Sequence, residues 1–405
     1  MKIKVGVIFG GETVEHEVSI ISAIQAIKKL DQEKYDVIPI YISKNREWYT
    51  GEMLKDIESY EDLSLVKKYA KNVILYYNKG AYVLQNKKFP RNIITDIDIA
   101  FPIMHGTNGE DGVIQGYLQS IGVPFVGGDI YASVVGQDKV FMKDIFEKEG
   151  LPITKYVWFY DEEYKNDQDV ILEKIRKLKY PVIIKPATTG SSVGIKVAGN
   201  KEELVEAIDN AIQYDSKIIV EEVVSNLKEV NISILGNYIN QTVSVIEEVT
   251  PKDKFLTYED KYIGNAKKGK MKGAVKYSSK GMASLSRKVP ADISKKLKEE
   301  VEDIAIRAFK VLGSAGVCRI DFLIDEKAKK VYINEINSIP GSLSYYLWEE
   351  KGVKFSELLD EMINIGIKDY KKRLSKTHSF ETNILAGFSA RGGFKGMKGV
   401  KGKLQ

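Results

Sequence analysis

Cysteine and histidine are scarce in this 405-residue chain. The single cysteine, Cys318, excludes an internal disulfide and any metal cluster built on cysteine thiolates. The three histidines, His16, His105 and His378, lie too far apart in the sequence to form a zinc site. No apolar run reaches the roughly eighteen residues that a transmembrane helix needs, and the short first run ends in a Gly-Gly turn, unlike a signal peptide. We therefore expect a cytoplasmic protein that does not insert into a membrane.

Excess charge is confined to the end of the chain. The formal net charge is +5, and residues 391–405 hold five basic residues and no acidic one. The rest of the chain is therefore close to neutral, which predicts no nucleic-acid partner. The Gly-x-Lys period of the tail, residues 376–405, favours a solvated segment over a contact with an anionic surface. RNA or membrane binding by this tail stays a weaker alternative.

The order of apolar and polar segments predicts an α/β fold with several domains. Residues 1–138 alternate strand-like and helix-like segments, the pattern of a doubly wound parallel sheet whose ligands lie at the carboxyl ends of the strands. Residues 139–225 continue with a helix, short strands and a Gly/Ser/Thr loop. Residues 226–375 combine antiparallel-looking strands with long helices, which is an α+β arrangement, and the basic tail 376–405 follows.

Residues 318–341, CRIDFLIDEKAKKVYINEINSIPG, predict a hairpin with convergent oxygen ligands. Side chains two apart on a strand share a face, so Arg319 and Asp321 point the same way, as do Glu335 and Asn337. A turn centred near residue 328 places Asp321 opposite Glu335. Two carboxylates and an amide oxygen suit Mg²⁺ shared with nucleotide phosphates, and the arginine could stabilise phosphoryl or oxyanion charge. The alternative is a surface hairpin with solvated acids.

A loop of small residues, 187–194, follows Lys185 at the end of a predicted strand. Small residues let backbone N–H groups and hydroxyls approach phosphate oxygens closely, so the loop could form a flap over phosphates. Taken alone, it is better read as a plain hairpin turn. Its place between Lys139 and the acidic pair Glu221-Glu222 favours the flap, because lysines contact phosphate and a strand end with carboxylates could hold adenine and ribose.

Two loops near the N-terminus carry further polar candidates. Glu15 opens the first predicted helix in GGETVEHEVS, where a carboxylate also favours the helix dipole without any catalytic role. The loop HGTNGEDGVIQG holds His105, Glu110 and Asp111 at the end of a predicted strand. A lone histidine in such a place is more often structural than catalytic.

Six ordered motifs resemble those of the D-alanine–D-alanine ligases of the ATP-grasp superfamily. They are GGETVEHEVS, HGTNGEDGVIQG, KPATTGSSVGI, TYEDKY at 257–262, RIDF and NEINSIPG. The resemblance spans roughly residues 1–370 and implies a three-domain ATP-grasp architecture. It also implies ATP and two Mg²⁺ (or Mn²⁺) ions per site, D-alanine as the small-molecule substrate, and a homodimer.

The same resemblance implies roles for individual residues. The two metal ions would be held by Asp321, Glu335 and Asn337. ATP would lie against Lys139, Lys185, Ser191, Ser192, Glu221, Glu222, Val224 and Glu229. Glu15 would orient the ammonium of the first D-alanine through a hydrogen-bonded trio with Ser191 and Tyr262. The carboxylates and the developing oxyanion would be served by Lys261, His105, Arg319 and the backbone of Gly341.

The function that this resemblance implies is ATP-dependent ligation of two D-alanines through an acyl phosphate, for peptidoglycan synthesis. One alternative is a ligase with a different acceptor, because the position of a usual family serine falls on Tyr346, with Ser344 two residues earlier. Tyr262 in place of a histidine favours an amine over a hydroxy-acid acceptor, again by resemblance. A second alternative is a non-catalytic nucleotide-binding regulator on the same scaffold.

Overall fold

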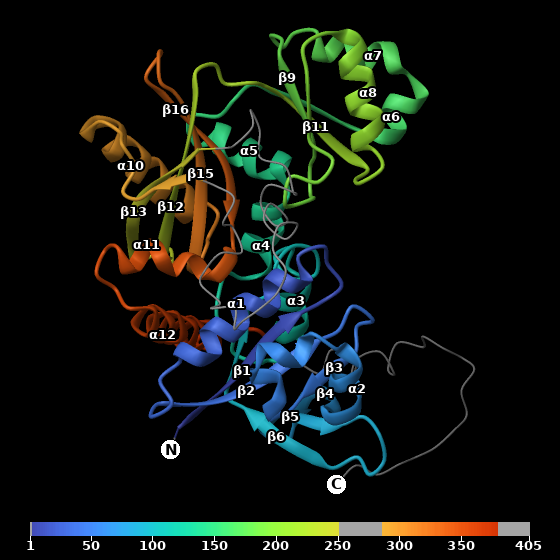
Figure 1. Ribbon diagram of the computed structural model, residues 1–405, viewed down its shortest axis with the longest axis vertical. Coiled ribbons are helices and arrows are strands. Elements are labelled where there is room, and N and C mark those ends of the chain that lie inside the picture. Colours follow the sequence, from blue (N-terminus) through green and yellow to red (C-terminus); the bar gives the residue numbers. More distant parts are fainter. Residues whose placement is uncertain (1, 251–285, 380–405) are drawn as a thin grey trace, which may run out of the picture.

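The computed structural model describes residues 2–250 and 286–379. Three β-sheets organise these residues, and each sheet is covered by its own helices. The first sheet lies at one end of the molecule, and the second and third lie side by side at the other (Figure 1). The predicted α/β class is confirmed.

The first sheet has seven strands in the order β6-β5-β4-β3-β2-β1-β7. Its strands are β1 (Ile3–Gly10), β2 (Tyr35–Ile42), β3 (Trp48–Thr50), β4 (Lys71–Asn78), β5 (Ala81–Asn86), β6 (Ile93–Ile97) and β7 (Ile99–Pro102). Only β2, β1 and β7 pair in parallel, and the strands beyond β2 pair antiparallel. The sheet is therefore mixed rather than parallel throughout. One cause is the two-residue turn Lys79-Gly80, where both φ angles are positive, because so short a turn joins only antiparallel strands.

The parallel strands bring two loops to one edge of the first sheet. Strand β1 is buried along most of its length, and helix α1 (His16–Lys29) packs its apolar face on it. Because β1 and β7 are adjacent and parallel, the loops that follow them meet at their carboxyl ends. Helices α3 (Val113–Ser120) and α4 (Ile130–Gln137) then lead to the second part of the chain, and α2 (Leu63–Tyr69) lies between β3 and β4.

The second sheet is antiparallel, with the order β10-β9-β11-β8. It comprises β8 (Tyr156–Tyr160), β9 (Val182–Pro186), β10 (Lys196–Ala198) and β11 (Lys217–Glu222). The apolar sides of α6 (Asp161–Asn166), α7 (Gln168–Ile175) and α8 (Lys201–Ala211) bury the outer face of this sheet (Figure 1). Its inner side faces the third sheet.

The third sheet has the order β14-β13-β12-β15-β16. It comprises β12 (Leu227–Gly236), β13 (Gln241–Thr250), β14 (Ser286–Lys288), β15 (Gly316–Asp325) and β16 (Lys330–Asn337). Helix α10 (Lys295–Val311) covers one face together with α5 (Lys139–Lys148), whose Met142 and Phe146 join the same apolar core. The chain then returns through α11 (Tyr345–Glu349) and α12 (Phe355–Leu374), and α12 packs into the core of the first sheet.

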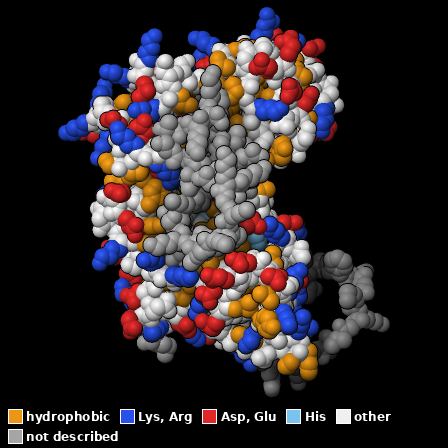
Figure 2. Space-filling model, viewed as in Figure 1, with side chains coloured by type: hydrophobic (Ala, Val, Ile, Leu, Met, Phe, Trp, Pro, Cys, Tyr) orange, Lys and Arg blue, Asp and Glu red, His pale blue; other side chains and the backbone are white. Residues whose placement is uncertain are grey.

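The surface visible in Figure 2 carries acidic and basic side chains that are interspersed over the described elements. Such mixing is typical of solvated faces. Among the described residues, no helix combines the length and apolar character that crossing a bilayer requires.

Candidate active site

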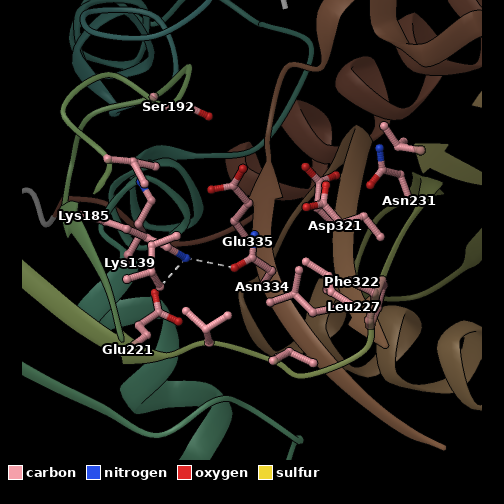
Figure 3. A pocket seen from close by; sticks show the side chains of 18 of the residues that line it. Lys139, Lys185, Ser192, Glu221, Leu227, Asn231, Asp321, Phe322, Asn334 and Glu335 are labelled. Carbon is pink, nitrogen blue, oxygen red and sulfur yellow. Dashed lines mark hydrogen bonds and ion pairs between the residues drawn. The ribbon is translucent and has the colours of Figure 1, made fainter. Parts of the chain in front are cut away.

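A cleft with about 1190 Å³ of empty space lies between the second and third sheets. Strands β9 and β11 form one wall, strands β12 to β16 form the other, and the loop after β9 closes one side. Predicted site residues from both walls meet here. The lining includes Lys139, Lys185, Ser191, Ser192, Glu221, Glu222, Val224, Glu229, Arg319, Asp321 and Glu335. Figure 3 shows the lysines and Glu221 on one side, Asp321 on the other, and Glu335 between them.

Glu221 is the centre of a buried ionic cluster. One of its carboxylate oxygens lies 2.9 Å from Lys185 Nζ, and the other lies 2.9 Å from Lys143 Nζ and accepts a 2.6 Å hydrogen bond from Thr154. Burial opposes the charged carboxylate, but the two ammonium groups win and hold the pKa of Glu221 well below its usual range. The sequence did not indicate Lys143 or Thr154. Their effect is to fix Lys185 at the cleft wall.

Lys139 begins α5 and is itself buried. Its Nζ donates to the carbonyl oxygen of Thr189 at 2.9 Å, which ties the loop after β9 to the helix. Burial lowers the pKa of the Lys139 ammonium, because an apolar surrounding disfavours charge. A buried cation close to the loop backbone is well placed to meet phosphate oxygens.

The predicted acidic hairpin is confirmed in its register. Arg319 on β15 lies opposite Asn337 on β16, and Asp321 lies opposite Glu335. The pairing then shifts by one residue, so Asn334 bulges out of the ladder. Asn334 consequently lines the cleft beside Glu335, and its amide oxygen accepts a 3.2 Å hydrogen bond from Lys185 Nζ across the cleft (Figure 3).

Arg319 grips the carboxylate of Asp321 with two parallel hydrogen bonds of 2.7 and 2.8 Å. Asn337 donates a 3.3 Å hydrogen bond to the same carboxylate. The three predicted metal ligands therefore lie on neighbouring strands. Within residues 2–250 and 286–379, no group of three or more His, Cys, Asp or Glu side chains could hold a metal. The set consists instead of two carboxylates and one amide oxygen, donors that suit a hard cation such as Mg²⁺.

The row of polar side chains continues across the third sheet. Asn231 on β12 lies between Asp321 on β15 and Glu247 on β13. Glu247 is fully buried and accepts hydrogen bonds from Asn231 at 3.2 Å and from the Tyr346 hydroxyl at 2.6 Å. Sequence reasoning missed Asn231 and Glu247. The alternation in NISILG and SVIEEV marks strand faces, but nothing in it identifies the partner 99 residues away.

Glu15 faces the loop after β9 rather than its own helix. It holds the N-cap position of α1 without a side-chain capping bond, and the Ser191 hydroxyl donates to its carboxylate. Two members of the predicted trio thus meet, while Tyr262 and Lys261 lie outside the described residues. Gly106 closes the other side, because a Cβ built there would lie 2.7 Å from a Glu15 oxygen. Glycine also suits this position because its φ is +70°, a conformation that residues with a side chain disfavour.

His105 is only 3% exposed, and both of its ring nitrogens are engaged within the protein. Nδ1 lies 2.7 Å from the carbonyl oxygen of Ile339, which can only accept, so Nδ1 carries the proton. Burial lowers the pKa of His105, so the ring is neutral and Nε2 accepts from Ser22 at 2.9 Å. Ser22 in turn accepts the backbone N–H of Ser342 at 2.9 Å. His105 therefore ties β7 and α1 to the loop after β16.

Glu110 also connects the loop after β7 to the loop after β16. Its carboxylate accepts the backbone N–H groups of Gly106 at 2.9 Å and Ile339 at 3.0 Å. Burial and the nearby charge of Glu15 raise the pKa of Glu110 to about 8. The loop that it holds contains Gly341, where a 3-10 turn (Gly341–Ser344) begins.

The family model described as the D-ala D-ala ligase N-terminus matches residues 4–128, and that of the D-ala D-ala ligase C-terminus matches residues 145–364. The chain belongs to the D-alanine–D-alanine ligase family. The predicted resemblance is thereby confirmed, and with it an ATP-dependent ligase with the ATP-grasp fold.

Members of the D-alanine–D-alanine ligase family match along nearly their whole length. The D-alanine–D-alanine ligase of Thermosipho melanesiensis is 38% identical over 95% of this chain and 98% of its own. That of Natranaerobius thermophilus is 40% identical over 90% of this chain and 95% of its own. Among solved structures, the Coxiella burnetii ligase has a TM-score of 0.77 at 25% identity, covering 92% of this chain and 96% of its own. The VanG D-Ala:D-Ser ligase of Enterococcus faecalis has a TM-score of 0.74 at 29% identity, covering 90% and 100%.

Proposed function

We propose that this protein joins two molecules of D-alanine into D-alanyl-D-alanine, with conversion of ATP to ADP and phosphate, for peptidoglycan synthesis. The observation that carries the proposal is the meeting of two charged walls in one cleft. Lys185 is fixed by Glu221 on one wall of the cleft. Its ammonium group reaches across to Asn334, which lies on the same wall as the acids Asp321 and Glu335. The lysines can bind phosphate oxygens, and the acids can bind the metal cations that accompany them. The two walls are close enough for one nucleoside triphosphate to contact both.

ATP would lie along this cleft with its phosphates toward the buried lysines. Lys139, Lys185, the Ser192 hydroxyl and the backbone N–H of Ser191 would contact the phosphate oxygens, because the Ser191 hydroxyl itself donates to Glu15. The adenosine would lie farther along the wall, against Glu222, Val224 and Glu229, which line the cleft near the end of β11 and the start of β12. The Glu221 carboxylate serves this site mainly by orienting Lys185.

Two Mg²⁺ (or Mn²⁺) ions would be held by Asp321, Glu335 and Asn337. Their chemistry is to neutralise charge on the phosphate oxygens during transfer. The donor types fit this assignment, and the approach of both strands gives it a geometric basis.

The proposed reaction requires no covalent bond between the enzyme and a substrate. A carboxylate oxygen of the first D-alanine takes the γ-phosphoryl group from ATP, which gives an acyl phosphate and ADP. The amine of the second D-alanine then attacks the acyl carbon. A C–N bond forms, the C–O bond to phosphate breaks, and phosphate and a proton leave. Closure of the cleft excludes the water that would otherwise hydrolyse the acyl phosphate.

The remaining predicted residues receive roles in this scheme. Glu15, with Ser191 and Tyr262, would orient the ammonium of the first D-alanine. Arg319 and the Gly341 N–H would stabilise the oxyanion, and Lys261 would contact the substrate carboxylates. His105, with both nitrogens engaged, acts by positioning the loop that carries Gly341.

A second candidate is a ligase that uses a different acceptor. Tyr346 favours this candidate, because its bulky side chain occupies the position where the family usually has a serine. Its hydroxyl donates a hydrogen bond to Glu247. We also propose a homodimer, by resemblance alone, and a cytoplasmic location, where ATP is available.

A product assay tests the proposal and separates the candidates. The protein is incubated with ATP, Mg²⁺ and single or paired D- and L-amino acids, and products are identified by mass. We expect D-alanyl-D-alanine from D-alanine alone. Absence of any dipeptide from D-alanine would overturn the lead proposal, and a mixed dipeptide in its place would establish the second candidate.

A further inference from the structure

Arg287 occupies the wall of the cleft on strand β14, next to β13. Its side chain is about 20% exposed. One terminal nitrogen lies 3.5 Å from Glu247, at the long limit of a hydrogen bond, and the guanidinium lies 5.1 Å from the centre of the Tyr346 ring. Its Nε is buried and has no hydrogen-bond partner among residues 2–250 and 286–379. A guanidinium that is held in place therefore keeps donors for another group.

We propose that Arg287 binds the α-carboxylate of the acceptor amino acid. The inference rests on the proposed ligase function and deepens it, since it identifies a residue that selects the second substrate. Tyr346 and Glu247 are positioning residues: the ring supports the face of the guanidinium and the carboxylate orients it.

The chemistry of the free donors selects the ligand class. Buried donors without partners are rare in folded proteins, and a planar guanidinium fork matches the two oxygens of a carboxylate. Phosphate oxygens would suit it as well, but Lys139 and Lys185 stand on the opposite wall with the loop of small residues. Arg287 lies toward Arg319 instead, because its neighbour Glu247 bonds to Asn231, and Asn231 pairs with the Asp321 that Arg319 contacts. This is the part of the cleft where the acyl carbon would be attacked.

Other side chains on the nearby turn cannot take this role. Tyr346 has one hydroxyl proton, and it is donated to Glu247, so none is left for a substrate carboxylate. Ser344 is 1% exposed and lines no part of the cleft. The contact that a serine hydroxyl would make at position 346 has therefore moved to a guanidinium from another strand.

Hydroxylamine offers a test, because it is an amine nucleophile without a carboxylate. With ATP and enough D-alanine to fill the donor site, it captures the acyl phosphate as D-alanine hydroxamate. We expect Arg287→Gln to raise the KM for D-alanine as acceptor at least tenfold while hydroxamate formation stays within about twofold of the wild-type rate. Arg287→Lys keeps the charge but loses the planar fork of the guanidinium. Its acceptor KM should therefore lie between those of the wild type and Arg287→Gln. The matched control is Arg176→Gln on the exposed surface, which should change neither rate.

Tyr346→Phe gives an independent measurement, since it keeps the ring and removes only the bond to Glu247. We expect a smaller rise in the acceptor KM, with hydroxamate formation again unchanged. An unaltered acceptor KM in Arg287→Gln would overturn the inference. So would an equal loss of dipeptide and hydroxamate in all three variants with wild-type melting temperatures, because Arg287 would then serve ATP or the donor. If the wild-type protein forms neither product, the proposed ligase function itself fails, which is a different result.

Discussion

Asp321 and Glu335 face each other across two paired strands, and Arg319 and Asn337 contact the first of them. Neither acid is needed to complete the apolar core beneath, which is built from the residues that alternate with them. At the scale of single side chains, the two carboxylates therefore contribute little to packing, and we expect their role to lie in function.

Asp321→Asn and Glu335→Gln should each reduce dipeptide formation by a factor of about a thousand or more, because charge on the transferred phosphoryl group would lose its counter-cation. The melting temperature of Glu335→Gln should stay close to that of the wild type. Steady-state rates and calorimetry check both statements. Asp303→Asn, on the exposed side of α10, is the control and should leave both unchanged. Near-normal rates in the two site variants would refute the metal assignment.

Glu110 predicts a pH dependence of stability. Because its pKa is raised to about 8, the folded state keeps a proton that the unfolded state releases above about pH 4.5. Its contribution to stability is thus complete below that pH and is lost as the pH rises to about 8. Glu110→Gln should reduce the fall in melting temperature between pH 5 and 8 by roughly 2–5 °C. An unchanged slope, equal to that of the exposed-site control Glu299→Gln, would contradict the raised pKa.

At the scale of elements, the turn after β16 has an unusual backbone. Ser342, Leu343 and Ser344 all have φ near +50°, a region that side chains with a Cβ disfavour. Leu343 is buried in the core of the first sheet, and Ser22 holds the N–H of Ser342. These contacts keep the turn, which begins at Gly341, in this conformation.

Ser344→Gly should therefore stabilise the protein, by about 1 kcal/mol, because glycine adopts this φ without strain. The serine hydroxyl is buried without a partner among the described residues, so its removal carries no cost in hydrogen bonds. Denaturant unfolding measures the change. Ser120→Gly, at a helical position with ordinary φ, should instead destabilise by roughly 0.5–1 kcal/mol. Destabilisation by Ser344→Gly would show that the hydroxyl contributes.

Elements also show where sequence reasoning succeeded. The two-residue period of RIDF and NEIN was enough to pair Asp321 with Glu335, since strand geometry is local. It could not anticipate that Asn334 turns into the cleft, because a bulge breaks that period and depends on neighbouring strands. Likewise, the sequence does not distinguish Lys143 from the other lysines on helices. Its role becomes visible only in the fold, where it forms an ion pair with Glu221.

At the scale of the whole molecule, the contact of Ser191 with Glu15 joins the second sheet to the first. The divisions predicted at residues 138, 225 and 375 stay predictions. The cores cross between regions, because α5 packs on the third sheet and α12 on the first.

Ser191→Ala should loosen the loop after β9 and admit water to the acyl phosphate. We expect the amount of ATP consumed per dipeptide to rise from about one to two or more, with a smaller change in ATP binding. Coupled measurements of ADP and dipeptide give the ratio. Ser120→Ala, whose hydroxyl donates to the Tyr117 carbonyl oxygen within its own helix, serves as the control. A ratio that stays at one would mean that this contact does not exclude water.

The hydrogen bonds that run from Ser342 through Ser22 and His105 to Ile339 limit how this protein can be recombined. They cross from the amino-terminal third of the chain to its carboxyl-terminal third and seat the backbone next to Gly341. A chimera that takes its first 120 residues from a distant homologue will inherit a functional cleft only if the donor supplies a hydroxyl and an imidazole at these two places. Swapping modules at the visible sheet boundaries alone would leave the turn at Gly341–Ser344 without these hydrogen bonds.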